Sequence, residues 1–180
     1  MTGRRRLLSA SGLGLLLAGC RGGAGRSSSL SALPPAVRAG DVAILNAALD
    51  REHQLIAAYT AGIPLLVEPG RVAAEQFLGQ HLAHAGQLAG WIKQAHAEAN
   101  KPLAAYGLGH PRTAMEMLTG LHSLENAMIA AYLAAIPKLS PGKLRANTAS
   151  MLANEAQHVA VLRSVLGLQP AQSALVTGGE

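Results

Sequence analysis

A nine-residue segment of this chain occurs twice. The first copy reads REHQLIAAY over residues 51–59, and the second reads LENAMIAAY over residues 124–132, which is 73 residues further along. Both copies place a Glu second and end in Ile-Ala-Ala-Tyr, and both are followed by an Ile-Pro pair at residues 63–64 and 136–137. A repeat at this distance indicates that one supersecondary unit has been duplicated.

A polar pair follows each copy of the repeat. His81 and His84 follow the first copy, and Glu155 and His158 follow the second. Residues three apart lie on one face of a helix. Two helical hairpins, each with a Glu on one helix and a spaced polar pair on the next, are typical of a carboxylate-bridged metal site in a four-helix bundle.

The composition favours an all-α fold. The 180 residues are 49% hydrophobic, with Ala and Leu abundant and aromatic residues at only 3%. This length is sufficient for one domain with a sizeable core, and the scarcity of β-branched residues favours helix over sheet. We therefore predict a four-helix bundle built from two helical hairpins.

Capping and helix-breaking residues predict the ends of the four helices. The expected boundaries are, in chain order, Asp41 to about Gly62, Arg71 to about Ala99, Pro111 to Pro137, and Ser140-Pro141 to Gly167. Residues 100–110 join the second helix to the third. Ten to twelve extended residues span roughly 35–40 Å at ~3.3 Å each, which is about the length of one helix. This linker is therefore long enough for a crossover connection between the hairpins.

Glu or His interrupts the apolar face of every predicted helix. These residues are Glu52 on the first helix, His81 and His84 on the second, Glu125 on the third, and Glu155 and His158 on the fourth. A buried charge without a partner costs several kcal/mol, and a metal ion offsets that cost by binding the lone pairs. The pattern predicts a metal centre in the core of the bundle.

The segment from Asp41 to Leu49, which leads into Glu52 and Tyr59, resembles the opening of the ferritin-like domains of secreted bacterial proteins and lipoproteins. The resemblance covers about residues 41–168. It implies a Glu ligand on helices one and three and a Glu-x-x-His pair on helices two and four. It also implies one or two divalent ions, iron or manganese ahead of zinc. The reaction class that it implies is oxidation by dioxygen or peroxide.

His81 departs from that family pattern, which has a Glu at this place. A carboxylate can bridge two metals, whereas a neutral imidazole offers one free nitrogen. Three Glu and three His also leave two divalent ions incompletely neutralised. The site is therefore expected to be dinuclear with one protein bridge, asymmetric, or occupied by a single metal ion. The alternative function is a non-catalytic envelope or stress-protection bundle with weak or lost metal binding.

Three further residues are candidates for a supporting role. His122 lies one turn before Glu125, where it could orient a carboxylate, add a ligand, or be a core histidine satisfied by a hydrogen bond. Tyr59 and Tyr132 each lie seven residues after a predicted Glu ligand. They could flank the centre as hydrogen-bonding or electron-transfer groups, or be core tyrosines whose hydroxyls find partners.

The first twenty residues resemble a bacterial lipoprotein signal. Arg4 to Arg6 precede a short apolar run that ends in Leu-Ala-Gly-Cys at Cys20, the only Cys in the chain. Lipidation of Cys20 would anchor the protein to the membrane on the periplasmic face of the cell envelope. An ordinary cleaved signal with a chance Cys is the alternative. General and twin-arginine export both fit these arginines.

The segments outside the predicted helices, and the overall charge, give little indication of function. Residues 21–40 are expected to form a flexible linker, and residues 169–180 a disordered tail. The formal charge of +5 does not indicate nucleic-acid binding, because three of the 15 basic residues lie in the signal and the other 12 are scattered among 10 acidic ones. A membrane tether is compatible with a homodimer.

Overall fold

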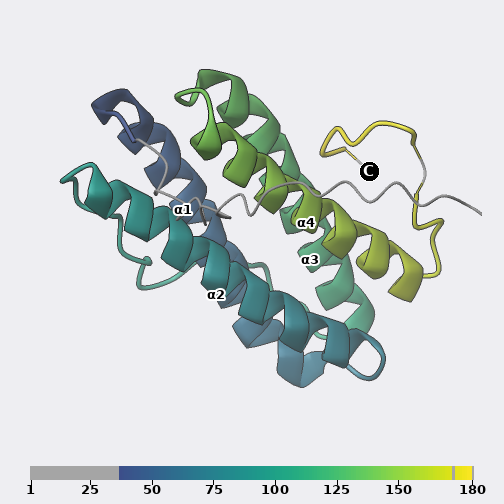
Figure 1. The fold of residues 1–180 in the computed structure, drawn as a ribbon. Helices are drawn as coiled ribbons and strands as arrows, with labels where there is room; N and C mark the ends of the chain where they lie inside the picture. Colours follow the sequence, from purple (N-terminus) through teal and green to yellow (C-terminus); the bar gives the residue numbers. More distant parts are fainter. Residues whose placement is uncertain (1–36, 172, 180) are drawn as a thin grey trace, which may run out of the picture. The chain divides into compact units, whose positions relative to one another are not determined.

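The computed structural model describes residues 37–171 and 173–179. The expected signal peptide, Cys20 and nearly all of the predicted linker lie outside the described residues. Within them the chain forms four α-helices and two short 3₁₀ helices, with no strand (Figure 1). The elements are α1 (Ala39–Gly62), η1 (Ile63–Leu65), α2 (Gly70–Gln94), α3 (Ala114–Ala135), η2 (Ile136–Lys138) and α4 (Lys143–Val165). The prediction of an all-α four-helix bundle is confirmed.

The repeated sequence produces a repeated hairpin. The two Ile-Pro pairs each open a 3₁₀ helix directly after α1 and α3, with the Pro in its first turn. Proline lacks a backbone N–H and cannot continue an α-helix, so both helices end at the same place in the repeat. The chain then turns back, and α2 packs along α1 while α4 packs along α3 (Figure 1). Further contacts between α1 and α3 join the two hairpins.

The connection between α2 and α3 runs beside α1. Near its start, the Asn100 backbone N–H donates to Oδ1 of Asn46, and the Asn100 amide contacts Asp50 at 2.9 Å. Further on, Leu108 lies beside Ala58 in the wall of one cavity. The connection therefore follows α1 from its first half toward its C-terminal end, as a crossover between hairpins requires.

The predicted end of the second helix, at Ala99, is wrong. α2 ends at Gln94, and His96 adopts a left-handed conformation with φ +55°. The His96 N–H donates to Lys93 O at 3.0 Å, and the Ala97 N–H donates to Ile92 O at 3.2 Å. This pair of bonds is a Schellman motif, which ordinarily uses Gly at the left-handed position. A His there gives no sequence signal for a helix end.

Three predicted helix starts also need correction. The first N-cap is Arg38, and Asp41 lies at the third helical position, where its carboxylate accepts the Arg38 N–H. α3 begins at Ala114 after the N-cap Thr113, whereas Pro111 was expected at its first position. α4 begins at Lys143, after Gly142 with φ +92°, whereas Ser140-Pro141 was expected to start it. Gly167 follows the end of α4 in a left-handed conformation, as predicted.

Thr113 and Glu116 form a capping box at the start of α3. The Glu116 N–H donates to Thr113 Oγ1 at 3.1 Å, and the Thr113 N–H donates to the Glu116 carboxylate at 3.3 Å. We expect Thr113→Ala to lower the free energy of unfolding by about 1 kcal/mol, because one backbone donor loses its partner. Urea unfolding measures the effect. Thr119→Ala, in the interior of the same helix, is the control and should change stability by less than about 0.5 kcal/mol.

No helix within residues 37–171 and 173–179 combines the length and the apolar composition needed to cross a membrane.

The C-terminal segment lies close to α3. Gly178 is so near this helix that an added Cβ would be 2.6 Å from the backbone nitrogen of Ala130. The described part of the C-terminal segment therefore contacts the bundle.

Candidate metal centre

The bundle brings all six predicted ligands together in its interior. α1 contributes Glu52, α2 contributes His81 and His84, α3 contributes Glu125, and α4 contributes Glu155 and His158. The side chain of His84 is 13% exposed, and those of the other five are at most 1% exposed. Their convergence follows from the helical spacing. Binding of a metal ion by them remains a prediction.

The six residues form two overlapping groups of possible ligands. Glu52, His81, His84 and Glu155 make one group, and His81, Glu125, Glu155 and His158 make the other. Within each group, one nitrogen or oxygen from every residue lies within 4.8 Å of the rest. His81 and Glu155 belong to both groups. These two residues each begin the polar pair on the second helix of a hairpin, so the duplicated hairpins place them at the centre of the site.

The imidazole of His81 lies between two carboxylates. Its Nδ1 is 2.9 Å from Oε2 of Glu52, and its Nε2 is 3.0 Å from Oε1 of Glu125. The two ring nitrogens therefore contact helices α1 and α3, one carboxylate from each repeat.

The other two imidazoles contact Glu155. Nδ1 of His84 is 2.8 Å from Oε1 of Glu155, and Nδ1 of His158 is 3.0 Å from Oε2. These atoms are at ion-pair distance but lack hydrogen-bond geometry, so both oxygens of Glu155 are buried without a well-aligned donor. Oε2 of Glu125 has no hydrogen-bond partner among the described residues. Buried carboxylate oxygens left without partners are costly, and a cation is the group that fits them.

Burial and mutual contact set the charges of the cluster. Burial lowers the pKa of His81, but its contacts with Glu125 and Glu52 outweigh burial and raise the pKa to about 10. For His84, burial is likewise outweighed by Glu155 and Glu52, and the pKa rises to about 9. Burial raises the pKa of Glu125, yet its contacts with His158 and His81 outweigh burial and leave the pKa well below its usual range. For Glu155, burial prevails over the neighbouring imidazoles, and its pKa is raised.

These shifts describe a cluster that neutralises itself without metal. Protonated imidazoles pair with carboxylates, which allows the bundle to bury six ionisable groups. A metal ion that binds the ring nitrogens has to displace their protons.

The tyrosine of each copy of the repeat donates a hydrogen bond to the glutamate of the other copy. The Tyr59 hydroxyl of α1 donates to Oε1 of Glu125 on α3. The Tyr132 hydroxyl of α3 donates to Oε1 of Glu52 on α1, at 2.7 Å. Both tyrosines are fully buried, and burial together with the adjacent carboxylates raises their pKa values well above the usual range. Their hydroxyls therefore stay protonated and orient the carboxylates. This contact fits both a hydrogen-bonding pair that flanks the centre and core tyrosines whose hydroxyls find partners, the alternatives that the sequence left open.

Two residues near the centre were not predicted as part of it. Gln80 places Oε1 2.6 Å from Nε2 of His158. Phe77 stacks on the His158 ring with centroids 4.0 Å apart. Gln80 lies beside His81 in sequence and off the inward face, so periodicity gives no signal for it.

His122 belongs to neither group of possible ligands. It is half-buried on α3, and its Nε2 is 3.3 Å from the side-chain nitrogen of Asn126, one turn further along. This contact accords with a histidine that is satisfied by a neighbouring polar group.

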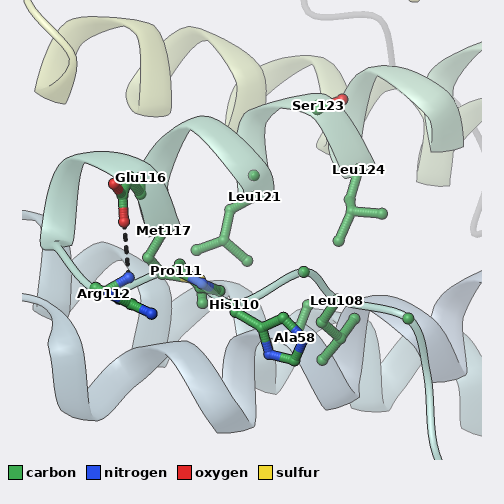
Figure 2. A pocket seen from close by; sticks show the side chains of 13 residues that line it. Ala58, Leu108, His110, Pro111, Arg112, Glu116, Met117, Leu121, Ser123 and Leu124 are labelled. Carbon is green, nitrogen blue, oxygen red and sulfur yellow. Dashed lines mark hydrogen bonds between the residues drawn. The ribbon is translucent and has the colours of Figure 1, made fainter.

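A cavity between two segments of the described residues lies outside the centre. It has a volume of about 720 Å³ and lies between the crossover and α3, where Figure 2 shows Leu108, His110 and Arg112 facing Met117, Leu121 and Leu124. None of the six predicted ligands lines it. It is therefore separate from the metal centre.

A family model matches this chain, and several solved structures are similar to it. The model of the ferritin-like domain matches residues 40–168. A conserved hypothetical protein of Mycobacterium tuberculosis has a similar structure, with a TM-score of 0.68, 21% identity, and coverage of 71% of this chain and 97% of that one. A ferritin-like, diiron-carboxylate protein of Bacillus anthracis has a TM-score of 0.56 and 20% identity, over 70% of this chain and 94% of its own. No curated protein matches this sequence.

Proposed function

This chain belongs to the ferritin-like domain family, and we propose that it binds one or two divalent metal ions at the centre formed by its four helices. The observation that carries the proposal is the set of unpartnered buried oxygens. Glu125 and Glu155 together keep three carboxylate oxygens buried without a hydrogen-bond donor among the described residues. These oxygens lie beside three imidazoles, and such mixed ligands suit iron or manganese ahead of zinc.

The residues around the centre support a redox function. A bound iron or manganese ion would supply a redox-active centre for reaction with dioxygen or peroxide. The metal itself could be the species that is oxidised. The chain contributes a site from which water is almost excluded, because five of the six ligands are at most 1% exposed. Tyr59 and Tyr132 hold the two repeat carboxylates in place. Preorganised ligands of this kind favour one coordination geometry over others.

We place this activity at the periplasmic face of the cell envelope. The support is the sequence Leu-Ala-Gly-Cys after a basic and apolar segment, with Cys20 as the lipidated residue. Labelling of cells with a palmitate analogue tests the lipid anchor separately from metal binding. The Cys20→Ala variant should lose the label and be released from membranes.

A non-catalytic bundle is the second candidate, and the self-neutralised cluster favours it. His81 pairs with both Glu52 and Glu125, so the interior is balanced in charge without a metal ion. In that case the cluster would specify the packing of the four helices and would bind metal weakly.

Elemental analysis separates the two candidates. We expect the purified protein, after growth with iron, manganese and zinc, to retain at least one ion per chain. A Glu155→Ala, His158→Ala variant should retain none, since it removes one of the two ligands shared by both groups and one further imidazole. A wild-type protein without metal would exclude the redox function and leave the non-catalytic bundle.

A further inference from the structure

One of the six predicted ligands is accessible from solvent. The side chain of His84 is 13% exposed, whereas those of Glu52, His81, Glu125 and Glu155 are fully buried. An ion that reaches the centre has to pass through the surface layer of the bundle. The exposed edge of His84 marks the point at which that layer is open.

A groove of about 530 Å³ leads to this point, and His84 forms part of its wall. It lies between α2 and α4. Each of these helices packs mainly on its own hairpin partner, and the two contact each other less extensively. Five neutral amide or hydroxyl side chains line the groove: Gln87, Asn147, Ser150, Asn154 and Gln157.

The chemistry of this lining suits a hydrated cation. Amide and hydroxyl oxygens can replace water molecules of the hydration shell one at a time. The lining contains no Lys or Arg to repel a cation, and no Asp or Glu to retain one before it reaches the centre. His84 and then Glu155, 2.8 Å away, are the first ionisable groups on the path.

A buried donor at the groove also lacks a partner. Trp91 is fully buried, lines the groove, and has an indole N–H without an acceptor among the described residues. A buried N–H without an acceptor is costly unless water or a ligand satisfies it. Water in the groove, including the shell of an incoming cation, supplies an oxygen for this bond.

Four other cavities of the described residues do not reach the centre, because none of them has a predicted ligand in its lining. On the side of α1 and α3, the buried rings of Tyr59 and Tyr132 cover the carboxylates.

We propose that the groove between α2 and α4 is the route by which a hydrated divalent cation enters the centre, with His84 as its first strong ligand. The side chains of Asn154 and Gln87 act as transient oxygen ligands along it. This inference rests on the proposed metal binding.

The rate of Co²⁺ uptake by the full-length chain tests the route. Stopped-flow absorbance gives the rate, and elemental analysis gives the final metal content. We expect Ser150→Trp to slow uptake at least tenfold with an unchanged final content, because the indole fills the groove. Ala149→Trp is the matched control, since Ala149 is exposed, adjacent in sequence and outside the lining. It should load at the wild-type rate.

Charge provides a second pair of variants that does not depend on a bulky side chain. Ser150→Lys should slow Co²⁺ uptake and Ser150→Asp should speed it, and both effects should shrink as ionic strength rises. Equal uptake rates in Ser150→Trp and Ala149→Trp, or in Ser150→Lys and Ser150→Asp, would overturn the route while leaving metal binding intact. A wild-type chain that holds no Co²⁺ at equilibrium would overturn metal binding itself.

Discussion

Replacing His81 with Glu should raise the metal content of the purified protein to two ions per chain and sharply destabilise its metal-free form. Without metal, the His81 imidazole lies between Glu52 and Glu125, at 2.9 and 3.0 Å. A carboxylate at this place removes both contacts and adds a fourth acid beside three others. Loss of one partner of a buried ion pair costs about 3–5 kcal/mol. For a domain of this size we expect the melting temperature to fall by roughly 10–20 °C.

With metal present, the same substitution should be stabilising. Four carboxylates neutralise two divalent ions, whereas the three of the wild-type chain leave one positive charge uncompensated. The wild-type protein should therefore retain one ion after gel filtration, and His81→Glu should retain two. Metal should also raise the melting temperature of the variant more than that of the wild type, because only the folded state binds the ions.

His81→Gln is the control for size and shape. It removes the imidazole as Glu does but adds no charge, so it should be less destabilised than His81→Glu and should retain no more metal than the wild type. Calorimetry of metal-free and metal-loaded samples measures the stability, and elemental analysis measures the content. Two ions in the wild-type protein would show that the missing carboxylate does not limit occupancy.

The position of the centre was predictable because it follows from helical periodicity and duplication. Glu52 and Glu125 occupy the same place in the repeat, and His81 and Glu155 each begin the polar pair that follows one copy of it. Once two hairpins pack through α1 and α3, these places converge, and any side chain there faces the axis of the bundle. The reciprocal bonds of Tyr59 and Tyr132 follow from the same symmetry.

Features that depend on single backbone conformations were not predictable. The end of α2 depends on a left-handed His96, a conformation that sequence patterns assign to Gly. The start of α3 is set by the capping box of Thr113 and Glu116. Its N-cap, Thr113, lies two residues beyond Pro111, which is the more prominent signal in the sequence. Gln80 of α2 contacts His158 of α4, and a contact of this kind depends on the side-chain rotamers rather than on the spacing of residues along a helix. The groove beside His84 is lined by residues of both α2 and α4, so its presence depends on how the two helices pack and not on the sequence of either one.

Asp41 should be among the most sensitive positions outside the centre. Its side chain is 3% exposed and accepts two backbone hydrogen bonds, from Arg38 at 2.8 Å and from Ser140 at 2.7 Å. One carboxylate thereby joins the start of α1 to the segment that precedes α4. Asp41→Ala leaves both donors without this acceptor, and we expect a loss of about 3 kcal/mol in the free energy of unfolding at pH 7. Asp50→Ala, at an exposed carboxylate on the same helix, should cost less than about 1 kcal/mol.

The effect of Asp41 should also depend on pH in a defined direction. Burial raises the pKa of this carboxyl, but the hydrogen bonds from Arg38 and Ser140 outweigh burial and leave it below its usual value of 3.8. The folded state therefore favours the ionised form, so the contribution is complete above pH 3.8 and is lost as the pH falls through the lower pKa of the folded state. Urea unfolding of the wild type and of Asp41→Asn at several pH values measures the contribution of the ionised carboxylate. We expect the difference in free energy of unfolding between the two proteins to be constant near neutral pH and to become smaller in acid. A difference that stays constant through this range would mean that the hydrogen-bonding shape of the side chain matters and its charge does not.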